Sequence, residues 1–180
     1  MTKEKAEIFS ILSHNSVAKK DIDYLCSLAV QDKDVFDELF ELIFKGDGKI
    51  DWHAAWAMEK VSEKTPTLFN RQHIARLTLL AIDNRHDSLQ RLCLSILVNL
   101  PVQNPISSDF INRCFAQMIS PKETVGVQVL SMKFLLKIGK IVPEFESEII
   151  VCLENTDDEL YSKGYIAAKR NTLKKLKINK

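Results

Sequence analysis

Two tryptophans and a glutamate at helical spacing form the sharpest chemical pattern in this sequence. Trp52, Trp56 and Glu59 stand at positions i, i+4 and i+7, so a helix would present all three on one face. Indole faces attract cations, and a carboxylate stabilises positive charge that develops beside it. The trio therefore fits a site for a cationic aromatic ligand. Helix-spaced aromatic residues are also typical of packing between helices, and tryptophan is enriched at protein-docking hot spots.

The C-terminal segment is the second chemical feature, because it is strongly basic. From residue 163 to the end there are seven Lys or Arg and no acidic residue, whereas the preceding residues hold 18 basic and 24 acidic side chains. Lys169, Arg170, Lys174 and Lys175 would suit nucleic-acid phosphates or an acidic partner. They would equally suit the solvated face of a last helix, since cations are favourable at a helix C-terminus. The acidic balance of the rest argues against a groove that wraps DNA.

Motifs for most other chemistry are missing from the sequence. There is no glycine-rich phosphate loop, no H-E-x-x-H or C-x-x-C metal motif and no G-x-S-x-G nucleophile turn. The four histidines are isolated from one another and from the cysteines in sequence, which is typical of surface or helix-end positions. We therefore expect no catalytic residues, no metal and no cofactor. A cysteine–histidine pair formed across the fold stays open at this point.

Cysteine use and hydropathy indicate the compartment. Cys26, Cys93, Cys114 and Cys152 are widely spaced, and three of them sit in apolar stripes, as buried thiols in a reducing compartment do. The first residues are polar and do not resemble a signal peptide. No run of about 20 apolar residues could cross a bilayer. We expect a cytoplasmic protein that makes no contact with a membrane.

The arrangement that must position these residues is helical throughout. Apolar residues recur at i, i+3, i+4 and i+7, for example over 36–44 and 89–100. Thr65-Pro66 and Ser120-Pro121-Lys122-Glu123 fit helix starts, the second as a capping box. The expected helices span 3–13, 16–30, 33–45, 50–64, 66–84, 86–100, 107–119, 122–142, 143–155 and 158–177. Short connections make neighbouring helices antiparallel.

A shift of about 37 residues superposes successive helix pairs, which indicates internal repetition. Three series of positions become equivalent: Ala55, Leu92, Val129 and Ile166; Ala57, Leu94, Ser131 and Ala168; Phe40, Leu77, Cys114 and Val151. This period predicts an all-α, right-handed α-α superhelix of about five antiparallel helix pairs. We expect one domain over 1–180, with a capping pair at 1–31 and a basic capping helix at 158–180, because the ends of a stack need a polar outer face.

Three stretches carry a family resemblance: IDWHAAWAMEKVSEKTPTLF, HDSLQRLCLSILVNL and CFAQMISPKETVGVQVLSMKFLLKIGKIVPEF. Over roughly 50–154 the chain resembles small bacterial HEAT-like repeat proteins of the armadillo type. The resemblance implies a scaffold whose concave face holds another macromolecule. The wider superfamily includes DNA glycosylases that remove alkylated bases, which would give the tryptophan–glutamate trio a role in base repair.

In HEAT-like stacks, the second helix of each pair lines the concave face. That arrangement would place Arg91 and Gln128 on the same surface as the helix of Trp52. Our leading hypothesis is a non-enzymatic scaffold that binds another protein through Trp52, Trp56, Glu59, Arg91 and Gln128. The alternative is a nucleic-acid-binding protein related to the alkylation-repair glycosylases, with contacts through the basic C-terminal residues. A third possibility is a degenerate repeat protein that stabilises an oligomer.

Overall fold

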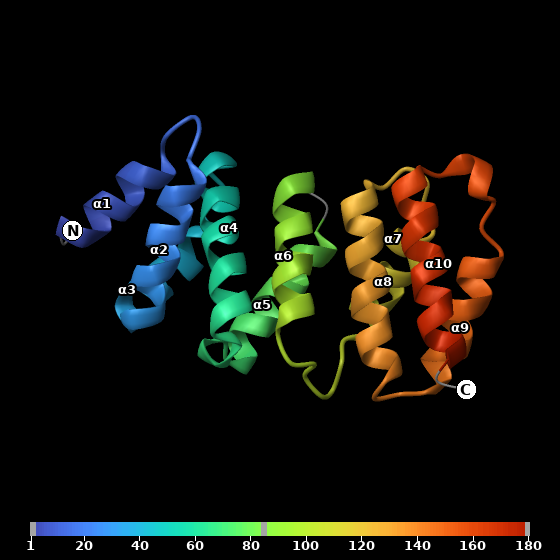
Figure 1. The fold of residues 1–180 in the computed structure, drawn as a ribbon. Coiled ribbons are helices and arrows are strands. Elements are labelled where there is room, and N and C mark those ends of the chain that lie inside the picture. The colour runs from blue at the N-terminus through green and yellow to red at the C-terminus, as the bar shows by residue number, and fades with distance from the viewer. Residues whose placement is uncertain (1–2, 84–85, 179–180) are drawn as a thin grey trace. The chain divides into compact units, whose positions relative to one another are not determined.

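The computed structural model describes residues 3–83 and 86–178, and these ranges are helical, without strands (Figure 1). The described part holds ten α-helices and two short 3₁₀ helices. In chain order they are α1 (Lys3–Leu12), α2 (Lys19–Gln31), α3 (Lys33–Leu42), α4 (Lys49–Lys64), η1 (Pro66–Leu68), α5 (Arg71–Ile82), α6 (Asp87–Asn99), α7 (Ser108–Met118), α8 (Val125–Gly139), α9 (Glu144–Glu154), η2 (Asp158–Leu160) and α10 (Lys163–Ile178). The predicted all-α fold of five helix pairs is confirmed.

The chain divides into two compact units, of which the first spans Met1–Pro101. In this unit the second helices of the pairs lie side by side, since α2 packs on α4 and α4 packs on α6 (Figure 1). Helix α3 packs against α2 and α4, and α5 packs against α6. The core between these helices is apolar, and Leu25, Ala55 and Leu94 are fully buried in it. This packing of successive pairs is of the α-solenoid type.

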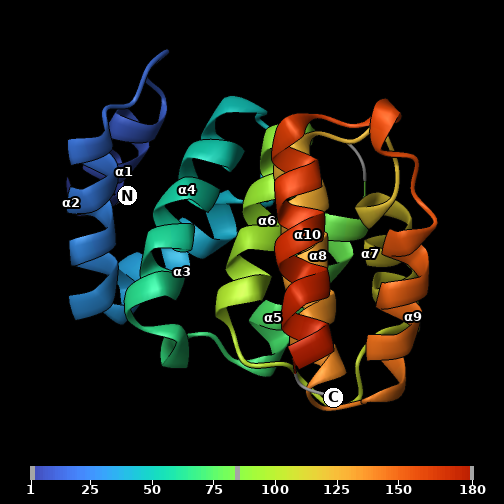
Figure 2. The ribbon, with the colours of Figure 1, turned by 45° about the vertical axis from the view of Figure 1, so that its right-hand side comes forward.

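The second unit spans Val102–Lys180, and α8 is its central helix. Helix α8 packs against α7, α9 and α10, and α9 also packs against α10 (Figure 2). Apolar residues on several sides of α8 are therefore buried against its neighbours, among them Val127, Phe134 and Ile138. A helix that is apolar nearly all round is expected to be surrounded in this way. The single domain over 1–180 stays a prediction.

A buried polar side chain near the start of three of the second helices binds a carbonyl at the end of a first helix or in the turn just after it. Nδ1 of His53 lies 2.8 Å from the Leu12 carbonyl oxygen. Nε2 of Gln90 donates to Ala81 over 3.2 Å, and Nε2 of Gln128 donates to Ser120 over 2.7 Å. The last carbonyls of a helix have no partner within it. His53 and Gln90 supply donors to carbonyls at the ends of α1 and α5, and Gln128 supplies a second donor to the Ser120 carbonyl just after α7.

The start of α5 differs from the predicted helix over 66–84. Pro66 begins the short η1, and the chain then extends so that Phe69 is buried with its ring edge against Phe36, 5.1 Å between centroids. Asn70, not Thr65, caps α5, because its side chain accepts from the amide of His73 over 2.9 Å. The prediction was wrong by five residues, since burying Phe69 outweighs the local start signal.

The starts of α8 and α10 also lie later than predicted. Thr124, not Ser120, caps α8, and the Glu123 carboxylate lies 3.5 Å from Arg113 instead of closing a capping box. The Ser120 carbonyl accepts a hydrogen bond from the side-chain amide of Gln128. Residues 158–160 form η2 rather than the first turn of α10. At α8 a tertiary partner, Arg113, thus takes the carboxylate that a local capping box would use.

The repeat equivalences hold in the first unit and weaken toward the end of the chain. Ala55 and Leu92 are buried, as are Phe40, Leu77 and Cys114. Val151, the next equivalent after Cys114, is 57% exposed. The buried positions of α9 are Ile149 and Leu153, two residues on either side of it. Helix α9 is therefore out of the common register by two residues.

An arginine joins the first helices of two successive pairs. Arg76 on α5 donates from both terminal nitrogens to the Glu41 carboxylate on α3, and its guanidinium lies 4.0 Å from the Phe44 ring centroid. Hydrogen bonding to Arg76 lowers the pKa of the Glu41 carboxyl below its ordinary value of 4.5. The paired geometry and the stacking are specific to arginine.

We expect Glu41→Gln to destabilise the protein near neutral pH by at most about 1 kcal/mol, because the pair is largely solvent-exposed. The folded-state pKa is lowered, so the contribution is complete above about 4.5, the ordinary value, and is lost as the pH falls through the lower folded value. Urea unfolding followed by circular dichroism should show that the free energies of unfolding of the unchanged protein and of the Glu41→Gln variant converge in acid. Glu148→Gln on α9 is the matched control, and an Arg76–Glu41 contribution that persists below both pKa values would contradict the assignment.

Candidate functional site

Helix α4 has a buried face and a face that carries the predicted site residues. Its start is fixed by Gly48, whose φ of +68° suits glycine, and by the Asp51 carboxylate, which accepts from the amides of Asp47 and Gly48. Ala54, Ala55 and Met58 then face the core. The partly exposed residues of the other face are Trp52, Trp56, Glu59 and Lys60.

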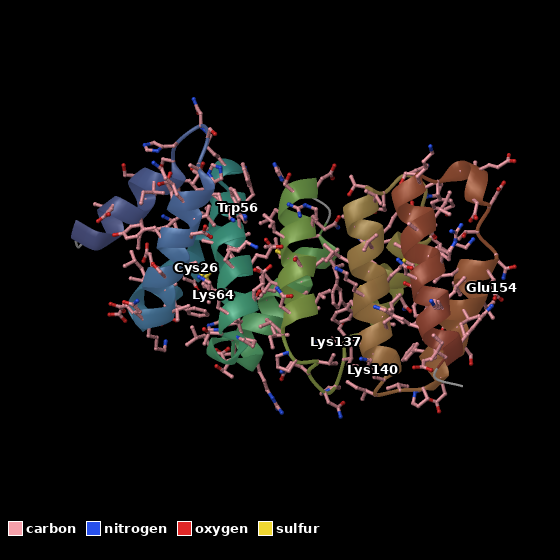
Figure 3. The ribbon with its side chains drawn as sticks, viewed as in Figure 1. Cys26, Trp56, Lys64, Lys137, Lys140 and Glu154 are labelled. Atoms are coloured by element: carbon pink, nitrogen blue, oxygen red, sulfur yellow. The ribbon has the colours of Figure 1, made fainter. Side chains whose placement is uncertain are left out.

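The two tryptophans stack on each other along this face. Their ring centroids are 6.4 Å apart with 16° between the planes, and Trp56 projects from α4 as Figure 3 shows. Trp52 also lies against the ring of the buried His53, 3.9 Å between centroids. Both indoles are half-buried, so they belong neither wholly to the core nor wholly to the surface. Part of the aromatic surface of each indole therefore remains exposed to solvent.

The Glu59 carboxylate lies beside a lysine that also pairs with Glu63. Lys60 Nζ lies 3.0 Å from the Glu63 carboxylate and 3.9 Å from that of Glu59. The hydrogen bond to Glu63 and the nearby Glu59 raise the pKa of Lys60 above its ordinary value. Glu59 is thus partly neutralised by a neighbour and is 13% exposed as a side chain. The face is mixed in charge and aromatic at its centre.

The remaining two predicted contacts lie apart from this trio. Arg91 is exposed on α6, the helix that packs beside α4. Gln128 belongs to α8 in the second unit, is 3% exposed, and donates its amide to the Ser120 carbonyl. Its side chain is engaged in holding α7 and α8 together. The structure therefore brings together Trp52, Trp56 and Glu59, with Arg91 on the adjacent helix.

We expect Gln128→Leu to lower the free energy of unfolding by about 1 kcal/mol, because the Ser120 carbonyl loses the shorter of its two hydrogen bonds and keeps the one from the Glu123 amide. Thermal and urea unfolding by circular dichroism measures this change. The exposed Gln72→Leu on α5 is the matched control and should change stability by less than about 0.5 kcal/mol. A Gln128 variant as stable as the control would show that the buried amide has no structural role.

The basic residues of α10 are partly neutralised by acids within the second unit. Lys169 contacts Asp158 at 2.6 Å and the Thr156 carbonyl at 3.1 Å. Lys177 contacts Glu154 at 2.8 Å. Arg170, Lys174 and Lys175 are exposed. The predicted nucleic-acid residues therefore divide into one ion-paired lysine and three solvent-facing cations, and no finding favours the nucleic-acid alternative.

The four thiols are the next candidate reactive groups, and each has a raised pKa. Burial raises the pKa of Cys93 and of Cys114 to about 12, and also raises the pKa values of Cys26 and Cys152. A reactive cysteine needs the opposite shift. Among the described residues no group of His, Cys, Asp and Glu could hold a metal ion, and no helix is long and apolar enough to span a bilayer.

The burial of the thiols gives a direct labelling prediction. Iodoacetamide at neutral pH should modify Cys152 first, because it alone is partly exposed, and should leave Cys93 and Cys114 unmodified until the protein unfolds. Mass spectrometry of proteolytic peptides identifies the sites. Cys152→Ser is the control and should abolish the fast phase. Rapid native labelling of Cys93 or Cys114 would contradict their burial.

A second cluster, which the sequence interpretation did not identify, lies in the second unit. Lys133 and Lys137 of α8 and Lys140, which directly follows α8, converge with Lys175 of α10 and Glu146 of α9 around a pocket of about 450 Å³. Figure 3 shows Lys137 and Lys140 at the C-terminal end of α8. The i, i+4, i+7 spacing of Lys133, Lys137 and Lys140 was a visible signal. Only the packing of three helices shows that Lys175 joins them.

These features define a class of protein: the described ranges form an all-α chain of successive helix pairs. A family model of the HEAT repeat domain matches residues 11–176. The chain belongs to the HEAT repeat family. No curated protein and no solved structure matches it. The predicted HEAT-like resemblance is confirmed, whereas the link to DNA alkylation repair is not.

Proposed function

We propose that this chain is a non-enzymatic scaffold that binds a protein partner through the tryptophan face, meaning Trp52, Trp56 and Glu59 of α4 together with Arg91 of α6. The stacked, half-buried indole pair is the observation that carries the proposal. HEAT repeats generally mediate protein interactions. Two aromatic rings held rigid on a helix offer a large contact area at little cost in conformational entropy.

The surroundings of the indoles also support a protein partner. Interface hot spots are aromatic or arginine residues surrounded by polar groups that exclude water. Trp56 is followed along α4 by the Glu59–Lys60–Glu63 ion pairs, and Arg91 is exposed on the adjacent helix. This mixture of both charge signs suits a protein surface better than a polyanion. The four free thiols support a cytoplasmic setting.

The test is recovery of partners from cell extract by immobilised protein. Trp56→Ala should lower recovery of the specific partner by at least about tenfold, because truncating a central hot spot costs 2 kcal/mol or more. Arg91→Ala should lower it less, since an exposed arginine at a rim contributes less. Circular dichroism confirms that each variant is folded.

Leu79→Ala is the matched control, because Leu79 is an exposed apolar residue, 68% accessible, on α5 rather than on a second helix. It should recover the partner as the unchanged protein does. Equal recovery by the Trp56 and Leu79 variants would exclude the tryptophan face as the contact surface. Loss of recovery with the Leu79 variant alone would place the contact on the first helices instead.

A further inference from the structure

The pocket of the second unit combines positive charge with an aliphatic wall. Its volume of about 450 Å³ lies within the range of small-molecule sites. Lys133, Lys137, Lys140 and Lys175 contribute four cations, and Glu146 contributes one carboxylate. The aliphatic part of the wall consists of Leu136, Leu176 and Ile178. Such a lining matches a ligand that has one anionic end and one apolar end.

Three of the four lysines of this pocket have no carboxylate partner among the described residues. Lys133, Lys137 and Lys140 stand at i, i+4 and i+7 along α8 and the residue that follows it, where like charges repel. Within the described residues, no ion pair joins Lys133, Lys140 or Lys175 to a carboxylate, Glu146 included. Burial lowers the pKa of Lys137, which an anion placed beside it would reverse.

Glu146 contributes the one carboxylate of the pocket and lies against the end of α8. A Cβ added to Gly139 would lie 2.9 Å from Cγ of Glu146, so this side chain lies close against the end of α8. The helix C-termini account for single cations at Lys140 and Lys175. They do not account for Lys133, which lies mid-helix. The convergence of cations from two helices needs a further explanation.

We propose that this pocket binds an amphiphilic anion, with a carboxylate or phosphate head group held by the lysines and an alkyl body against Leu136, Leu176 and Ile178. A nucleic-acid backbone fits less well, because phosphates track over exposed cations and leave an aliphatic wall unused. The ammonium groups bind either head group by charge-assisted hydrogen bonds. The pocket belongs wholly to the second unit, so the site is independent of the tryptophan face.

The test is calorimetric titration of the full chain at about 50 mM salt, where charge screening is limited. The probes are octyl phosphate and octanoate, both kept below micelle-forming concentrations. Octanol and inorganic phosphate test the alkyl chain and the head group of octyl phosphate separately. We expect saturable binding of the two charged amphiphiles and at least about tenfold weaker binding of each half, because neither half uses both parts of the lining. The tighter of octyl phosphate and octanoate identifies the preferred head group.

The decisive variant is Lys133→Gln with Lys140→Gln, two exposed positions where the substitution should leave the fold intact. It should weaken octyl phosphate binding by about tenfold or more. Lys122→Gln with Lys163→Gln removes the same charge elsewhere in the second unit and should change binding by less than about twofold. Leu136→Asn tests the aliphatic wall and should also weaken octyl phosphate.

Several outcomes would overturn the proposal. Binding that the Lys133/Lys140 variant retains would place the amphiphile elsewhere. Inorganic phosphate that binds as tightly as octyl phosphate would remove the role of the aliphatic wall. Binding of a short DNA duplex that is lost in the same variant, without binding of either amphiphile, would replace the amphiphile with a polyanion.

Discussion

The fold depends on the way the carbonyl ends of the first helices are satisfied. A helix leaves its last carbonyls without partners, and in stacked pairs the next helix covers some of them. His53 and Gln90 each reach back from the start of a second helix to such a carbonyl, and Gln128 reaches the Ser120 carbonyl in the turn after α7. A buried acceptor without a donor costs about 1–3 kcal/mol, so these positions restrict both register and rotation. The apolar core then fills the space that this restriction leaves.

The rotation of α4 follows from His53 and determines the candidate surface. With His53 turned to the Leu12 carbonyl and Ala54, Ala55 and Met58 in the core, the neighbouring Trp52 and Trp56 are left at the boundary. Their stacking covers part of each indole, and the ion pairs of Lys60 continue the same face. The proposed contact surface is therefore the face of α4 that its buried residues leave outside the core.

The sequence predicted the helices well because periodicity is a local property, and it predicted less wherever distant residues compete. The tryptophan–glutamate spacing placed Trp52, Trp56 and Glu59 on one face correctly. Gln128 was interpreted as a contact because the second helices of HEAT-like stacks line the concave face, whereas its side chain is buried and bonded to the Ser120 carbonyl. The predicted helix starts at Thr65 and Ser120 were wrong because contacts with residues distant in sequence decide where these helices begin. The lysine pocket needs α8, α9 and α10 together, which no single stretch contains.

Both tryptophans of the sequence lie on α4, so the tryptophan emission of the protein, excited where tyrosine does not absorb, originates in the first unit. Far-ultraviolet circular dichroism, by contrast, is summed over the helices of both units. The two probes would trace one transition only if the units unfold together, and two transitions if they unfold separately. The placement of two aromatic residues therefore makes this protein its own reporter of cooperativity between the halves of the chain.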